Sequence, residues 1–429
     1  MNYLKKSKAD TIKGQLTRCS LTALLAVFLF VTLLFISNLG SADQMRARFA
    51  NSEPSALRFT ECEVGLSIII RQDRDLLSSL LPRTYPFDIG RPCDDLLRVV
   101  EESAVDQSKR LRPRYWWGFK AVYALMLSKL TTTEAATAMT WFSHGCYLLL
   151  GLSLFRLSKF TFLVMSPFIL MPPFLSGIHF HSEPPIALGY IWAVLASAIY
   201  ANLLKSKTME NWLYPFILFT GMVTAFLWFM GGELLLLAPL LILITFLYRL
   251  GHQSLTTRFL NTIKVVSLLH IGFVLSMLIG YAIKASVYGL EPVIASFTEA
   301  ANHRLSLQAK GANISFLGVL KQLSFRGFQH TAVYDNVLMW KTLLVSAGIT
   351  GLLGFMYLAV KTIRQFKQYG LVLMIFASVL GYFLLRVLIV PNHSYIHSWM
   401  IGRYVIVPIC LCWSTLIYAA VDIKKGFLK

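Results

Sequence analysis

The sequence predicts an all-α protein that crosses a membrane many times, and three observations lead to this prediction. Of the 429 residues, 56% are hydrophobic and only 14% are charged. A soluble domain of this size cannot bury so much apolar surface. The apolar residues form long runs, and basic residues fill the short segments between alternate runs. We therefore expect one integral membrane domain over residues 1–429.

The apolar runs predict ten membrane-spanning helices. Two of the intervening segments are longer than simple connections, 41–133 and 289–340. Within the first, residues 114–130 begin with Arg, Tyr and two Trp, which predicts a helix lying at the membrane surface. The ten runs cover residues 20–39, 134–155, 161–178, 186–203, 211–230, 234–248, 265–287, 342–360, 370–390 and 401–421.

The basic residues predict which side of the membrane each loop faces. The N-terminal segment before the first run is basic and should remain in the cytoplasm. Counting spans from there, every short cytoplasmic loop carries Lys or Arg, and both long loops fall outside. The net charge of +19 follows from this topology and does not indicate a nucleic-acid partner. We expect both termini in the cytoplasm and an uncleaved first span, although Gly40-Ser41-Ala42 would suit signal-peptidase cleavage.

The first long loop is rich in acidic residues. Twelve of the chain's 21 Asp and Glu lie between Ser41 and Leu111. Within this stretch, the pair Asp94-Asp95 has two interpretations. It suits a helix N-cap before Leu96, which the spacing alone favours, and it also suits a general base that accepts the proton of an incoming hydroxyl group. Both interpretations remain open.

The cysteines divide into two groups. Cys62 and Cys93 lie in the loop expected to face an oxidising compartment, where a disulfide between them is one of two open outcomes. The others lie in or beside apolar runs, and we expect them to pack as small hydrophobic side chains. These are Cys19, Cys146, Cys410 and Cys412.

The first loop ends in a basic and aromatic run that includes Arg112, Arg114, Trp116 and Trp117. Arginine forms forked hydrogen bonds with phosphate oxygens, and tryptophan stacks on sugar faces. The same residues also anchor helices among lipid headgroups, so phosphate binding and simple anchoring both remain open.

A third candidate lies before the last span. His393 and His397 are four residues apart, and Arg403 follows just inside the apolar run. An arginine at that depth is costly unless it meets an anion, a carboxylate or water. We expect the histidines to hydrogen-bond a phosphate or a sugar rather than to bind a metal, because no spaced His partner accompanies them. By the same reasoning, Arg386 is a candidate for contact with an anion.

Further polar residues occupy the other outer segments. His179, His181 and Glu183 form one turn, and Glu233 lies in another. The second long loop holds further candidates for contact with an acceptor, and their spacing does not favour one over another. They are Glu299, His303, Arg304, Arg326, His330 and Asp335. The chain has no Walker A loop, Rossmann glycine fingerprint or His-Glu-x-x-His motif. We expect no cofactor, while a divalent metal remains open.

These patches resemble a known family. The layout of one span, a long outer loop with an acidic pair, a surface helix and many further spans is similar to the GT-C membrane glycosyltransferases. Arg114-Tyr115-Trp116-Trp117-Gly118 resembles the Arg-Tyr-Trp-His-Gly segment of a group of bacterial polytopic proteins. Asn392-His393-Ser394-Tyr395-Ile396-His397, followed by Arg403, resembles the ending of that group. Trp117 departs from the pattern, because that group has His there.

The resemblance implies a function in the bacterial cell envelope and in polysaccharide biosynthesis. The chain would transfer a sugar from a polyprenyl-phosphate donor to a glycan or lipid acceptor on the periplasmic face of the inner membrane. Asp94 or Asp95 would be catalytic, and Arg403, His393, His397 and Arg114 would contact the lipid phosphate. A polysaccharide polymerase or ligase of the O-antigen type is the main alternative, followed by a lipid-linked glycan transporter or flippase. A non-catalytic scaffold is a further class.

Overall fold

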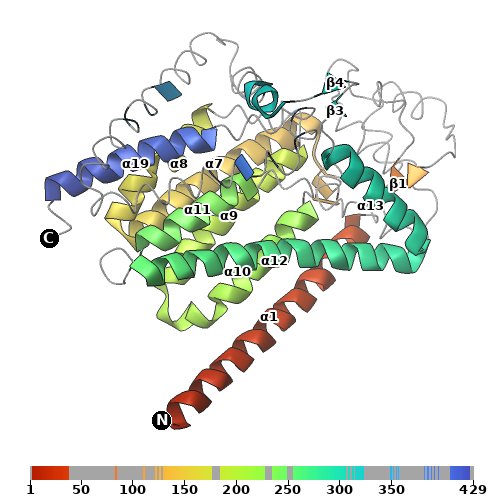
Figure 1. Cartoon of the computed structure of the whole chain (residues 1–429), viewed down its shortest axis with the longest axis horizontal. Helices are drawn as coiled ribbons and strands as arrows, with labels where there is room; N and C mark the ends of the chain where they lie inside the picture. The colour runs from red at the N-terminus through yellow and green to blue at the C-terminus, as the bar shows by residue number, and fades with distance from the viewer. Residues whose placement is uncertain are drawn as a thin grey trace.

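The described residues of the computed structural model form a bundle of apolar helices (Figure 1). The main helices are α1 (Asn2–Ser37), α7 (Thr132–Leu157), α8 (Lys159–Leu175), α9 (Pro184–Lys205), α10 (Leu213–Leu227), α11 (Leu234–Tyr248), α12 (Leu255–Tyr288), α13 (Leu290–Leu305) and α19 (Ile406–Lys425). The structure describes residues 2–37, 83–84, 110–111, 121–122, 125–126, 129–175, 184–227, 234–248, 255–305, 308–309, 312–313, 315–322 and 406–425, with single residues between 348 and 395.

Consecutive helices run back and forth. α7 and α8 are separated only by Ser158 and lie antiparallel, with Phe155 and Phe162 in edge-to-face contact at 5.6 Å. A single residue and a 3-10 helix, η2 (Lys207–Trp212), separate α9 from α10. α8 also lies antiparallel to α19, because Phe160 near its start packs against Tyr418 late in α19, with ring centroids 5.6 Å apart.

α11 lies at the centre of the bundle. Its sequence is apolar on every side, with four leucines in its first turn, which predicts a helix without a polar face. Every residue from Leu234 to Leu247 is buried, and the helix packs on both α9 and α12. α10 is similarly enclosed. These two helices have little surface left for lipid.

α12 is peripheral by contrast and buries one face only. Its buried residues recur every three or four positions, which is the helical period. The residues between them are partly or largely exposed, and Ile271, Val274 and Leu278 are each more than half exposed. We call the buried row the α12 stripe, and its members are Val265, Leu269, Gly272, Ser276, Gly280 and Lys284.

α10 and α12 touch backbone to backbone. A Cβ added at Gly221 in α10 would collide with the carbonyl oxygen of Leu269 in α12. A Cβ added at Gly272 would collide with the carbonyl oxygen of Leu218 in α10. Paired glycines that allow such close approach are common where membrane helices associate, since lipid supplies no hydrophobic driving force between them. The crossing therefore depends on both glycines.

A second glycine row packs along α19. Gly348, Gly351 and Gly354 are spaced three residues apart, and their Cβ positions approach Ile409, Cys412 and Leu416 in the same order. The described part of the predicted span 342–360 therefore runs parallel to α19. This direction agrees with the alternation of spans predicted from the sequence.

The buried hydroxyl groups mostly bond within their own helices. Ser197, Thr220, Thr224 and Thr415 each donate a hydrogen bond to the carbonyl oxygen four residues earlier, at 2.7 to 2.9 Å. This back-bonding lets Ser and Thr lie inside an apolar bundle without an unsatisfied donor. β structure in the described residues is limited to the antiparallel pairs β1 (Arg83–Thr84) with β2 (Arg110–Leu111) and β3 (Gln308–Ala309) with β4 (Ala312–Asn313).

The prediction of an α-helical membrane protein is confirmed at this coarse level. Of the described helices, four are long and apolar enough to cross a membrane, within Lys13–Leu34, Thr137–Leu157, Leu188–Lys205 and Thr257–Ser286. α8, α10, α11 and α19 contain shorter apolar helices. These eight helices match eight of the ten predicted runs, while the runs at 342–360 and 370–390 lie mostly outside the described residues.

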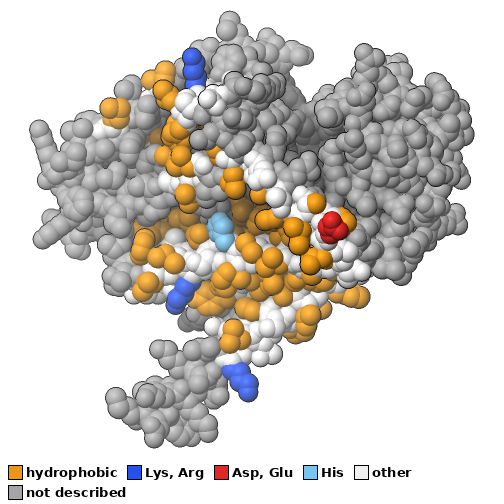
Figure 2. Space-filling view, turned by 45° about the vertical axis from the view of Figure 1, so that its right-hand side comes forward, with side chains coloured by type: hydrophobic (Ala, Val, Ile, Leu, Met, Phe, Trp, Pro, Cys, Tyr) orange, Lys and Arg blue, Asp and Glu red, His pale blue; other side chains and the backbone are white. Residues whose placement is uncertain are grey.

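The described outer surface of the bundle is apolar. Leu24 and Phe28 in α1 and Trp141 and Leu148 in α7 are all largely exposed. Figure 2 shows hydrophobic side chains spread over one face of the described helices, with few charged ones among them. A surface of this kind suits contact with lipid chains rather than with water.

The predicted packing of the cysteines is confirmed for three of them. Cys146, Cys410 and Cys412 are buried free thiols, and Cys19 is partly exposed on α1. Cys62 and Cys93 lie outside the described residues.

Candidate functional site at one end of the bundle

The two ends of the helix bundle differ in charge, and basic residues are concentrated at one of them. Lys205 at the end of α9 donates a hydrogen bond to the carbonyl oxygen of Arg156 at the end of α7, with an N–O distance of 2.6 Å. Arg258 near the start of α12 stacks on Phe246 near the end of α11, with 4.9 Å from its guanidinium carbon to the ring centroid. Lys159, three residues after Arg156, is the first residue of α8. We call this the basic end.

Polar contacts between helices fix the register of the bundle near the basic end. The side-chain amide of Asn202 in α9 donates to the hydroxyl of Ser153 in α7 at 2.7 Å. Tyr200 in α9 and Thr245 in α11 share a hydrogen bond of 2.7 Å between their hydroxyls. Side-chain hydrogen bonds of this type hold α7, α9 and α11 parallel at this level.

The opposite end, here called the candidate end, gathers the other helix termini. It comprises the C-terminal ends of α1, α8, α10 and α12 and the N-terminal ends of α7, α9, α11 and α19. Phe30 late in α1 stacks on Phe226 late in α10, with ring centroids 4.1 Å apart. Ile279 and Ile283, late in α12, pack on the same cluster. In Figure 1 the C-terminus and the start of α12 lie on the left, and the end of α12 with α13 lies on the right.

α7 begins at the candidate end with an N-terminal capping box. Thr131 accepts a hydrogen bond from the backbone N–H of Glu134, and the Glu134 carboxylate accepts from the Thr131 backbone N–H at 2.8 Å. This reciprocal capping box satisfies two of the donors that a helix start leaves free. Glu134 therefore has a structural role as a cap.

All the site residues predicted from the sequence lie outside the described residues. They are Asp94, Asp95, Arg114, Trp116, Trp117, His179, His181, Glu183, Glu233, His393, His397 and Arg403. Arg112, Arg386, Arg326, His330 and Asp335 also lie outside, and for Glu299, His303 and Arg304 the structure describes only the α13 backbone. The structure therefore gives no distances between the predicted catalytic and binding groups.

The helix termini that flank these residues are described, and all of them belong to the candidate end. The segment with Asp94 and Arg114 joins α1 to α7, and that with His181 joins α8 to α9. The segment with Glu233 joins α10 to α11, and Arg403 precedes α19 by three residues. The segments that carry these residues are thus joined, along the chain, to helix termini at the same end of the bundle.

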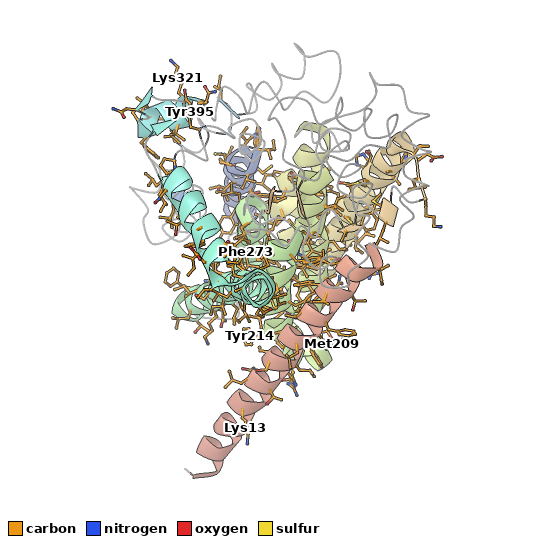
Figure 3. All side chains as sticks on the ribbon, turned by 90° about the vertical axis from the view of Figure 1, so that its right-hand side faces the viewer. Lys13, Met209, Tyr214, Phe273, Lys321 and Tyr395 are labelled. Carbon is orange, nitrogen blue, oxygen red and sulfur yellow. The ribbon has the colours of Figure 1, made fainter. Side chains whose placement is uncertain are left out.

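Two described residues lie next to the predicted motifs in the chain. Ala121, four residues after Trp117, is 2% exposed and belongs to the cluster formed by α1 and α10 at the candidate end. Tyr395, between His393 and His397, packs on the large hydrophobic core that is formed chiefly by α7, α8, α9, α11 and α19. That core also includes Val319 from the helical segment 316–322, and Figure 3 shows Tyr395 and Lys321 in the same part of the view. Ala121 and Tyr395 are therefore both part of packed structure.

Lys284 is the charged residue that sequence reasoning undervalued. Its position near the end of a predicted span suggests an ordinary boundary lysine. The structure instead places it on the buried α12 stripe with only 4% of its surface exposed. The periodic row from Val265 to Gly280 was the available signal, because the next position in that row is Lys284. A buried lysine near the end of a span is a candidate functional residue.

Another buried polar group lies deeper in the bundle. Tyr147 in α7 and Tyr190 in α9 are both buried, with ring centroids 6.3 Å apart. The thiol of Cys410 in α19 donates to the carbonyl oxygen of Pro167 in α8 at 3.4 Å. Within the described ranges, no three His, Cys, Asp or Glu side chains come together as a metal site.

The chain was compared with protein-family models, with curated proteins and with solved structures, and none of them matches. The function is therefore inferred from the residue types and from the helix termini to which their segments are joined.

Proposed function

We propose that this protein is a membrane glycosyltransferase of the GT-C type, which transfers a sugar from a polyprenyl-phosphate donor to a glycan or lipid acceptor. One observation carries the proposal. The segments with the acidic pair, the Arg-Trp patch and the His-Arg patch all leave from the candidate end, although they are separated by up to three hundred residues in sequence. A reaction site built from them needs this common attachment.

The distribution of charge supports an outward orientation for the candidate end. Lys205, Arg156 and Arg258 gather at the basic end, and basic residues accumulate on the cytoplasmic side of membrane proteins. The candidate end would then face the periplasm of a bacterial inner membrane. A polyprenyl-phosphate sugar is already activated when it reaches that face, so no nucleotide is required there.

In the proposed reaction, the acceptor hydroxyl attacks the anomeric carbon of the donor sugar. Its proton passes to the carboxylate of Asp94 or Asp95, which acts as general base. The bond between the anomeric carbon and the phosphate oxygen breaks, and its electron pair remains on that oxygen. The products are the glycosylated acceptor and a polyprenyl phosphate with one additional negative charge.

The additional charge on the leaving phosphate requires positive groups close to the membrane surface. Arg403 and Arg114 would donate forked hydrogen bonds to the phosphate, with His393 and His397 as further donors. Trp116 and Trp117 would stack against the sugar or hold the segment at the headgroup layer. The buried side chain of Lys284 lies at the same end of the bundle.

Deletion of the gene should cause the unused donor to accumulate in the cell. Mass spectrometry of the extracted lipids is expected to find more of a polyprenyl monophosphate that carries one sugar, and the surface glycans should lack that sugar. Complementation with the intact gene should restore both. Accumulation of an oligosaccharide on a polyprenyl diphosphate would instead assign the protein to the polymerases or ligases, and unchanged lipids and glycans would contradict an envelope transferase.

A further inference from the structure

α13 has an apolar side that the described part of the chain leaves largely exposed. Leu290, Ile294, Phe297 and Leu305 are each between 52 and 64% exposed. Their spacing of four, three and eight residues places them on one side of a helix that turns every 3.6 residues. Glu291 and Asn302, which lie away from this row, are exposed as well. α13 is therefore an amphipathic helix whose apolar side faces outward.

The orientation of α13 is fixed by its junction with α12. Gly289, with a φ of +86°, is the one residue between the two helices, and glycine adopts this left-handed conformation without strain. Phe297 then packs edge-to-face on Tyr281 of α12, with ring centroids 5.9 Å apart. Val293, on a third side of α13, is buried. The exposed row is thus held in place by a glycine turn and by packing on α12.

Along the chain, the exposed row of α13 comes soon after an exposed apolar row on α12, which is a candidate membrane span. In α12, Ile271, Val274 and Leu278 are largely exposed, and the span that contains them ends at Ser286. Three residues later the chain turns into α13. A helix that starts within one turn of the end of a span lies at the membrane boundary, where an exposed apolar side meets lipid.

We infer that α13 lies in the outer leaflet of the same membrane, with the row Leu290, Ile294, Phe297 and Leu305 in contact with lipid chains. Its opposite side would face the aqueous space above the candidate end. α13 would then form a floor at the membrane surface beside the candidate end. This inference depends on the membrane placement of α12 and not on sugar transfer.

Photo-crosslinking of the full-length protein in its native membrane tests the inference. One variant carries p-benzoylphenylalanine in place of Ile294, on the apolar row. The matched control carries it in place of Asn302, on the same helix but on the polar side. A reference variant carries it in place of Leu278 on α12. After illumination, mass spectrometry of the intact protein measures the yield of adducts with one phospholipid.

The yield of lipid adduct at position 294 is expected to lie within about twofold of that at position 278 and roughly tenfold above that at position 302. Equal yields at 294 and 302 would show that α13 stands away from the membrane. Adducts between two copies of the chain at position 294, with no lipid adduct, would show that a second copy covers the row. Either of these results overturns the inference, and neither depends on whether the protein transfers sugar.

Discussion

Replacement of Gly272 by alanine is expected to prevent the bundle from reaching its native packing. The added Cβ would fall on the carbonyl oxygen of Leu218, which belongs to the backbone of α10 and cannot rotate away as a side chain can. Gly221→Ala should have the same effect, since its Cβ would meet the carbonyl oxygen of Leu269 and come within 2.9 Å of the Phe273 nitrogen. Overpacking typically costs about 1–3 kcal/mol, and a clash with backbone should exceed that range.

The measurement is the fraction of monodisperse protein after extraction in mild detergent, together with its thermal midpoint. Gly145→Ala in α7 is the matched control, because nothing lies within 4 Å of its added Cβ. Alanine favours a helix over glycine by about 1 kcal/mol, so the control should keep or raise the midpoint. A wild-type midpoint for Gly272→Ala would show that α10 and α12 do not cross at these two glycines.

Asp94→Asn combined with Asp95→Asn is expected to abolish sugar transfer without reducing the amount of protein in the membrane. The amide keeps the size of the carboxylate and can still accept a hydrogen bond, but it cannot take the proton of the acceptor hydroxyl. A general base typically contributes about 10²- to 10⁴-fold to the rate, so transfer should fall by at least about a hundredfold. The readout is restoration of the surface glycan in the deletion strain.

The control for this prediction comes from the same acidic loop. Asp73→Asn combined with Asp75→Asn removes the same charge from a pair of acids outside the proposed site, and the glycan should be restored in full. Full activity of the Asp94/Asp95 variant would refute the assignment of the base. If activity instead survives loss of both acids but disappears with Arg403→Ala, the polymerase or ligase class is favoured, because those sites depend chiefly on arginine and histidine.

The sequence predicts individual helices better than it predicts which helices touch. Apolar runs locate α7, α9 and α11, because a segment without a polar side must be buried or in lipid. The crossing of Gly221 with Gly272 was not predictable, since a glycine in a span gives no indication of the partner it approaches. Lys284 was undervalued for the same reason, because its burial depends on which side of α12 packs inward.

α13 shows a different limit. Its amphipathic pattern is present in the sequence, but the length of the segment 289–340 predicts a long loop, and the apolar row alone does not show that a helix begins directly after α12. The proposed surface helix over 114–130 is supported only where Ala121, Val122, Leu125 and Met126 are helical. The acidic pair, the Arg-Trp patch and Arg403 rest on residue types and on resemblance, with the bundle supplying their common point of attachment.

The end of the bundle that carries the proposed site is expected to face away from the cytoplasm. Labelling with a membrane-impermeant maleimide tests it most directly, in a background with Cys62→Ser and Cys93→Ser. Ser182→Cys, between α8 and α9, samples the candidate end, and Ser206→Cys, between α9 and η2, samples the basic end. In intact cells with a permeable outer membrane, the maleimide should label position 182 directly. It should label position 206 only after the inner membrane is opened. Labelling of position 206 but not of position 182 in intact cells would contradict the account, because the proposed site would then face the cytoplasm.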